Sequence, residues 1–264
     1  MTLHPDLLRY LAGTLAGGVV GLSLGLVGGG GSILSVPLLV YVVGVSNPHL
    51  AIGTSALAVA ANALLNMVGH ARHGRVKWKI AGLFAAAGVM GAALGSQAGK
   101  MLDSRRLLAC FAVLMLVVGV MMLRFRFATA HPDEPLDRRS IPRLAMTGGL
   151  TGAVCGFFGI GGGFLIVPGL LYAGRLPILQ AVGSSLVAVT AFGLTTALNY
   201  ARSGWVDWPL AATLIVGGML GGLVGIQLAQ RLAARSGLLH ICFAVIVFLV
   251  AAYMLYRSSA GLFS

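Results

Sequence analysis

Long runs of apolar residues, separated by short polar loops, dominate this sequence. A helix needs about 20 such residues to cross the hydrocarbon core of a bilayer. The runs that meet or approach this length are 8–27, 52–69, 78–98, 107–127, 144–158, 178–200, 208–229 and 238–256. Only 9% of the residues are charged and 58% are hydrophobic, whereas about 25% charged residues is usual for a soluble domain. The sequence therefore predicts an all-α polytopic membrane protein whose outer surface contacts membrane lipids.

The basic residues give the chain a formal charge of +12, which in a soluble protein would suggest nucleic acid as a partner. Here they lie between the apolar runs, and no basic stripe interleaved with aromatic residues is present. Lys and Arg collect in cytoplasmic loops and contact anionic headgroups there. We therefore predict no nucleic-acid partner, and we place the 70–79 loop and the polar segment 128–143 in the cytoplasm.

The second half of the chain repeats the first. Val36-Pro37 recurs as Val167-Pro168, and the residues that follow match at a spacing of about 130. The matched pairs include Gly28 and Gly159, Gly30 and Gly161, Gly31 and Gly162, Ala51 and Ala181, Gly53 and Gly183, Ser55 and Ser185, Arg72 and Arg202, and Trp78 and Trp208. We divide the chain into a first transmembrane repeat at 1–127, a polar, proline-rich linker at 128–143 and a second transmembrane repeat at 144–264.

Each repeat also contains a shorter apolar run, at 32–45 and 163–174, which begins on a glycine cluster and holds a proline. Runs this short rarely cross a bilayer alone, so each repeat is expected to have four full helices and one broken or re-entrant helix. Five crossings per repeat would make the repeats inverted, and four would make them parallel. We favour inverted repeats, because the 70–79 loop holds four basic residues and its copy at 200–209 holds only Arg202 beside Asp207.

Glycines spaced by four residues recur along the long runs. They are Gly13, Gly17, Gly21 and Gly25, then Gly91, Gly95 and Gly99, then Gly148, Gly152 and Gly156, then Gly217, Gly221 and Gly225. Small residues at this spacing let helices approach closely in lipid, where hiding apolar side chains from water supplies no driving force. The pattern predicts helix packing, and a bulky residue at Gly21 or Gly152 should damage folding.

The glycine clusters at 28–32 and 159–163 have a different expected role. Neither has the sequence of a Walker loop or of a dinucleotide-binding turn. At the start of a helix, unpaired N–H groups and about half a positive charge can hold a small anion without a cationic side chain. The alternative reading is a tight turn alone. We predict that the two clusters face each other near the membrane midplane.

The apolar runs carry neutral polar side chains instead of charges, and each of these can either form a hydrogen bond across helices or line a path for a polar solute. No acidic residue lies well inside a run, so no carboxylate is available there to bind or relay a cation. The cysteines lack metal or redox spacing, and we predict no metal, no cofactor and no catalytic residue. Gly183-Ser184-Ser185 resembles a serine-nucleophile site, but its copy reads Gly53-Thr54-Ser55. We interpret His70 and His73, at the end of a run, as membrane-interface residues.

Together, the segments 28–39, 159–168, 51–55 and 181–185 resemble the TauE/SafE family of sulfite and organosulfonate exporters. The resemblance covers nearly all of the chain except the linker. It implies a multi-pass transporter in a bacterial inner membrane that exports a small sulfur-containing anion such as sulfite, sulfoacetate or another organosulfonate. A channel-like or regulatory membrane protein, or a permease for another small solute, remains as an alternative.

The resemblance suggests which residues line the substrate site. They are Gly30, Gly31, Pro37, Ser55, Gly161, Gly162, Pro168 and Ser185. To these we add Ser32, Gly163, Thr54, Ser184 and Asn62, which lie in the same clusters or on the same polar runs. Ser32 is replaced by Gly163 in the second half, so the two half-sites differ chemically. The direction of transport, the coupling ion and assembly into a homo-oligomer stay open.

Overall fold

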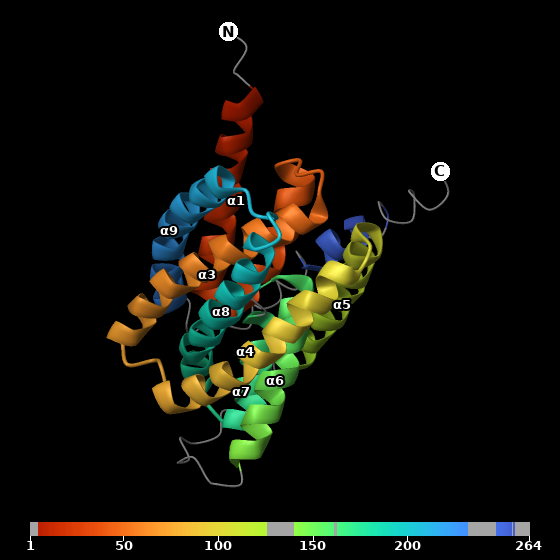
Figure 1. Cartoon of the computed structure of the whole chain (residues 1–264). Coiled ribbons are helices and arrows are strands. Elements are labelled where there is room, and N and C mark those ends of the chain that lie inside the picture. Colours follow the sequence, from red (N-terminus) through yellow and green to blue (C-terminus); the bar gives the residue numbers. More distant parts are fainter. Residues whose placement is uncertain (1–4, 126–139, 161–162, 232–246, 255, 257–264) are drawn as a thin grey trace.

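The computed structural model of this protein describes residues 5–125, 140–160, 163–231, 247–254 and 256 (Figure 1). Within these ranges the regular secondary structure is helical, and no strand is present. The long helices are α1 (Pro5–Val27), α3 (Pro48–Arg72), α4 (Trp78–Met101), α5 (Ser104–Phe125), α6 (Ser140–Phe158), α8 (Ile178–Ala201) and α9 (Trp208–Arg231). The all-α prediction is confirmed for the described residues.

Five of these helices are long and apolar enough to cross a membrane. The candidate spans are Leu7–Leu26, Pro48–Arg72, Trp78–Met101, Leu179–Ala201 and Trp208–Leu228, in α1, α3, α4, α8 and α9. Helix α6 begins at Ser140, earlier than its apolar run, and Pro142 lies in its first turn. Proline is tolerated there because the first amides of a helix have no intrahelical acceptor. Of the predicted run 238–256, residues 247–254 are helical and the segment before them lies outside the described residues.

The shorter apolar run of the first half is a broken helix, as expected. It consists of a 3-10 segment η1 (Gly28–Leu34), one α-helical turn α2 (Ser35–Pro37) and a π-helical segment η2 (Leu38–Val42). Pro37 has no amide hydrogen, so a regular ladder of hydrogen bonds cannot pass through it. The run of the second half is one short helix, α7 (Gly163–Gly174), which contains Pro168.

Helices of the two halves pack on each other in matched pairs. Helix α1 lies along α9, and α6, the copy of α1, lies along α4, the copy of α9. Single contacts repeat in the same way. Gly17 packs against Leu214, and its copy Gly148 packs against Phe84, the copy of Leu214. The duplication seen in the sequence is therefore also a duplication of contacts.

The glycine ladders lie in these two helix pairs. A Cβ atom on Gly21 would overlap the backbone of Gly218 in α9, and a Cβ atom on Gly152 would overlap the backbone of Gly88 in α4. Backbone meets backbone there, so no side chain can move aside to make room. The predicted packing role of these glycines is confirmed.

Helices α3 and α8 occupy the centre of the molecule. In their candidate spans 67% of the residues are buried, against 39% in the spans of α1, α4 and α9. The outer helices expose large apolar side chains, including Leu15, Met90, Leu94 and Leu220. Such a surface is unfavourable in water and suits contact with lipid tails. Polar groups of α3 and α8 are thus held inside an apolar shell.

Candidate functional site

The broken helix of the first half packs against the short helix of the second half. Segment η1 contacts α7, and it also contacts α1 and the central helix α8. Residues 31–37 are all buried. Of the predicted site residues, this brings Gly31, Ser32 and Pro37 into the interior, while Pro168 of α7 is half-buried. Gly30 belongs to η1, Gly163 begins α7, and Gly161 and Gly162 lie outside the described residues.

Two of the cluster glycines have a clear structural requirement. A Cβ atom on Gly31 would overlap the backbone of α1 at Ser23 and Leu24. Gly159 has a φ of +66° at the end of α6, a left-handed conformation that glycine adopts most easily and that commonly ends helices. The tight-turn reading therefore holds for Gly159, and a close approach of two backbones explains Gly31.

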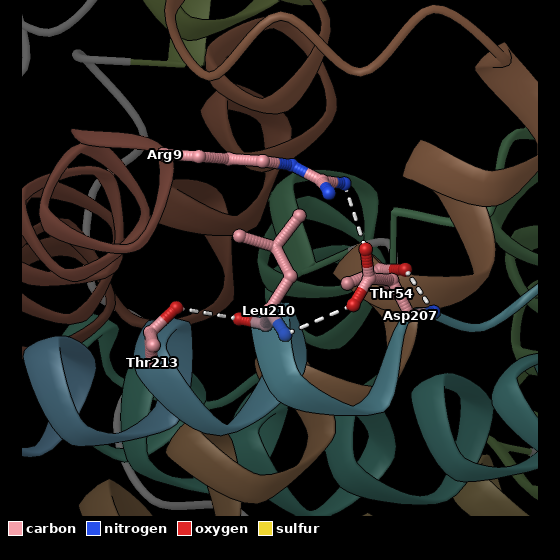
Figure 2. Close-up of polar contacts among 5 residues, drawn as sticks. All are labelled: Arg9, Thr54, Asp207, Leu210 and Thr213. Atoms are coloured by element: carbon pink, nitrogen blue, oxygen red, sulfur yellow. Dashed lines mark hydrogen bonds and ion pairs between the residues drawn. The ribbon is translucent and has the colours of Figure 1, made fainter. Parts of the chain in front are cut away.

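Thr54 and Ser184, both predicted site residues, hold the starts of helices in the opposite repeat. Thr54 Oγ1 in α3 accepts a hydrogen bond of 2.9 Å from the amide of Asp207, just before α9 (Figure 2). Ser184 Oγ in α8 accepts one of 2.9 Å from the amide of Lys77, just before α4. Lys77 and Asp207 are themselves matched positions. Of the two roles left open by the sequence, Thr54 and Ser184 therefore fill the structural one, a hydrogen bond across helices.

Asp207, which Thr54 contacts, also forms an ion pair with Arg9. Figure 2 shows Arg9 of α1 reaching Asp207, with Arg9 Nη2 donating to Asp207 Oδ2 at 2.7 Å. Asp207 Oδ1 also accepts from the amide of Leu210 at 3.1 Å, which caps the start of α9. The Arg9 side chain is 36% exposed, so such a pair contributes about 1 kcal/mol or less. Lys77 and Ser140 occupy the matched positions in the other half, and they cannot form this pair.

The Thr54 contact leads to a first prediction. Thr54→Val keeps the shape of the side chain but leaves the part-buried amide of Asp207 without its acceptor. A fully buried amide without a partner costs about 1–3 kcal/mol, so the loss here should lie toward the lower end of that range. We expect a lower melting temperature of the detergent-solubilised protein, measured by thermal unfolding. Thr54→Ser, which retains the hydroxyl, should melt like the original, and equal melting of Thr54→Val would contradict the assigned contact.

Several buried polar atoms of this region have no hydrogen-bond partner. Ser55 is fully buried, and its Oγ is unpaired, whereas Oγ of its copy Ser185 donates to the carbonyl of Val182 at 2.7 Å. Ser35 Oγ is also buried and unpaired. Most buried polar groups in proteins have a partner, so these hydroxyls are candidates for contact with a bound solute.

Asn62, Asn66 and His70 form a stripe on one face of α3, and we call these three residues the α3 polar stripe. They are spaced by four residues and are at most 3% exposed. The Asn62 amide lies against Gly218 and the Asn66 amide against Gly222, both in α9. Asn62 Nδ2 donates to the carbonyl of Leu214 at 3.3 Å, while Asn62 Oδ1 has no partner.

The second half replaces this stripe with less polar residues. Phe192, Thr196 and Tyr200 occupy the matched positions on α8, and Phe192 fills the space beside Gly88. The polar interior of the protein is therefore asymmetric between its two halves.

The interpretation of His70 as a membrane-interface residue is wrong, because its side chain is only 1% exposed. The neighbouring His73 is exposed, as expected. His70 shares a helix face with Asn62 and Asn66 and is covered by the helices that pack there. The four-residue spacing of these polar residues was the signal in the sequence that could have indicated burial.

Comparison with known proteins gives consistent relationships. The model of the family described as "Sulfite exporter TauE/SafE" matches residues 13–254. A "Probable membrane transporter protein" of Xylella fastidiosa (strain 9a5c) is 53% identical over 94% of this chain and 95% of its own length. The "Probable membrane transporter protein YunE" of Bacillus subtilis (strain 168) is 25% identical over 95% of this chain and 96% of its own length. No solved structure matches the chain significantly.

Proposed function

Because this chain belongs to the TauE/SafE sulfite exporter family, we propose that it exports a small sulfur-containing anion, such as sulfite or an organosulfonate, as a secondary transporter. Membership of the family makes it a multi-pass membrane transporter. The match of the family over residues 13–254 carries the proposal, since it reaches into both repeats and covers four of the five candidate membrane spans and most of the first, Leu7–Leu26. A bacterial inner membrane is the location that goes with this function.

We further propose that the repeats are inverted in the membrane. In Figure 1, α1 and α3 run down the view, whereas their copies α6 and α8 run up it. Helix α1 of the first half contacts α9 of the second, and α6 of the second half contacts α4 of the first. This reciprocal pairing supports a two-fold relation between the halves. Inverted repeats commonly place a substrate site between them, near the bilayer midplane.

The proposed anion site lies where η1 and α7 meet, beside α3 and α8. Its ligands would be amides of the glycine segments at Gly30, Gly31 and Gly161–Gly163, together with the hydroxyls of Ser32, Ser55 and Ser185. No Lys or Arg is buried among the side chains whose burial the structure describes, so oriented peptide dipoles and hydroxyls would supply the attraction. A site without a fixed cation binds weakly and releases its anion readily, which suits export.

Flux into proteoliposomes tests this function. We expect purified protein to mediate saturable uptake of sulfite or sulfoacetate, and preloaded unlabelled anion should accelerate entry of labelled anion by counterflow. Counterflow distinguishes a transporter from a channel, because a channel has no alternating site that exchanges bound substrate. Failure of every sulfur oxyanion to move above protein-free liposomes would refute the proposal.

A further inference from the structure

The interior of this protein holds few groups that can change charge near neutral pH. Among the side chains whose burial the structure describes, no Lys, Arg, Asp or Glu is buried, whereas His49 and His70 are. Histidine is the side chain that ordinarily gains or loses a proton between about pH 5 and 8. Any proton bound inside the described part of the protein near neutral pH is therefore most readily bound by one of these two residues.

The two histidines have different surroundings. The His49 ring stacks on Trp205, with ring centroids 4.7 Å apart, and lies near the Leu102 backbone and Asp103. In contrast, neither ring nitrogen of His70 has a partner in good hydrogen-bonding geometry, although the Gly25 backbone lies beside the ring. A neutral imidazole has one nitrogen lone pair that can accept a proton. His70 is thus buried with that lone pair unused.

One neighbour of His70 lies close in the sequence to the η1 part of the proposed anion site. The backbone of Gly25, in the last turn of α1, lies beside the ring, and the η1 glycines begin three residues later at Gly28. Asn66 lies one turn away on the α3 polar stripe.

The charged groups around the ring come from the end of α3 and the loop that follows it. They are His73 and Arg75. Residues 11–27 of α1 and 208–230 of α9 contain no ionisable side chain, and the one in α8 is Tyr200. No carboxylate from these helices therefore competes for a proton on His70.

We propose that His70 is the proton-binding group of this transporter, and that it takes up one proton when the anion enters and releases it when the anion leaves. The inference rests on the proposed function. An anion in a low-dielectric interior is costly unless an opposite charge accompanies it. The proton adds to the free lone pair of the imidazole, and the resulting imidazolium supplies that charge only while the anion is present.

The residue matched to His70 in the second half indicates that helix packing at this position does not require a histidine. Tyr200 occupies the matched position, is fully buried, and has a hydroxyl without a partner. The fold thus accepts a polar aromatic side chain at this place that does not titrate near neutral pH. The proposed proton site therefore lies on the side of the α3 polar stripe and is not repeated at the matched position of α8.

Proton movement linked to anion movement tests the proposal. The full-length protein in liposomes receives a gradient of sulfite or of sulfoacetate, and a trapped pH-sensitive dye reports internal pH. Protein-free liposomes correct for sulfite that crosses lipid in protonated form. Sulfoacetate remains ionised between about pH 6 and 8, so any proton that accompanies it is carried by the protein. Wild type should show anion-linked proton movement and a flux that changes by up to about tenfold per pH unit.

His70→Gln should reduce the anion-linked proton movement to the level of protein-free liposomes and flatten the pH dependence, and labelled-anion counterflow should slow because the anion loses its accompanying charge. His73→Gln is the matched control, because His73 is exposed on the same helix end, and it should behave like wild type. If His70→Gln fails to fold, as judged by gel filtration in detergent, His70→Tyr introduces the side chain found at the matched position. That variant should also move anions without protons.

The outcomes separate the two proposals. Wild-type flux of either anion without protons would overturn the role of His70 and leave the proposed function intact. Proton movement that survives in His70→Gln at the wild-type ratio would overturn it as well. If neither anion moves with wild type, the proposed function fails and this inference falls with it.

Discussion

Gly152→Leu should abolish recovery of folded protein. A Cβ atom alone on Gly152 would overlap the backbone of Gly88 in α4, and leucine adds three further carbons to that contact. Overpacking a core against movable side chains already costs about 1–3 kcal/mol. Here two helix backbones would have to separate along the α4 and α6 pair. The free-energy cost of that separation should be a large fraction of the about 5–15 kcal/mol that stabilises a typical protein. The measurement is the yield of monodisperse protein in detergent, by gel filtration.

Gly82→Leu provides the matched control. Gly82 lies in α4, is exposed, and has nothing within 4 Å of the position where a Cβ atom would stand. Its leucine variant should be recovered in nearly normal amounts. Gly21→Leu, at the position matched to Gly152, should fail to the same extent, because its contact with Gly218 is the copy of the one between Gly152 and Gly88. Normal recovery of Gly152→Leu would contradict the role assigned to the ladders.

Ser55→Ala should reduce anion transport strongly without lowering stability. The hydroxyl of Ser55 is fully buried and has no partner, so removing it relieves an unsatisfied polar group in the empty protein. If Ser55 Oγ donates to the anion, its loss removes a hydrogen bond to a charged group, worth about 1.5–3 kcal/mol. This corresponds to a fall in affinity of about 10- to 100-fold. Concentration-dependent uptake of sulfite and thermal unfolding measure the two effects.

Neighbouring variants distinguish a substrate contact from a structural one. Ser185 Oγ is bonded to the carbonyl of Val182, so Ser185→Ala should change affinity less than Ser55→Ala does. Thr54→Val should behave in the opposite way, with reduced stability and retained affinity. A Ser55→Ala protein that transports with wild-type affinity would remove Ser55 from the proposed site.

The sequence alone predicted much of the fold because the relevant signals are local. The length of apolar runs identified the membrane class and located the helices to within a few residues, since each helix must match the bilayer that surrounds it. The four-residue glycine spacing predicted helix packing, and the proline after the η1 glycines predicted a broken helix. Gly152 could therefore be assigned correctly without knowledge of its partner.

The predicted site could be located only in part from sequence. For Thr54 and Ser184 the sequence left open a substrate path or a hydrogen bond across helices, and their hydroxyls accept from amides of the opposite repeat. His70 was expected at the membrane surface and is buried. In both cases the sequence identified the residue type but not its surroundings, because those surroundings come from helices far away in the chain.

The sequence by itself determined that this protein is a duplicated membrane protein built of helices, because solvent and helical periodicity act on each segment separately, and its glycine and Val-Pro motifs indicated the TauE/SafE family by resemblance. Only the tertiary structure decided that α1 packs on α9, that α6 packs on α4, and that Thr54 binds the amide of Asp207, 153 residues away. It also decided which polar groups remain unpaired in the interior. Those results depend on how helices cross, and many crossings satisfy the same apolar pattern in lipid, so close backbone contacts and buried hydrogen bonds select among them.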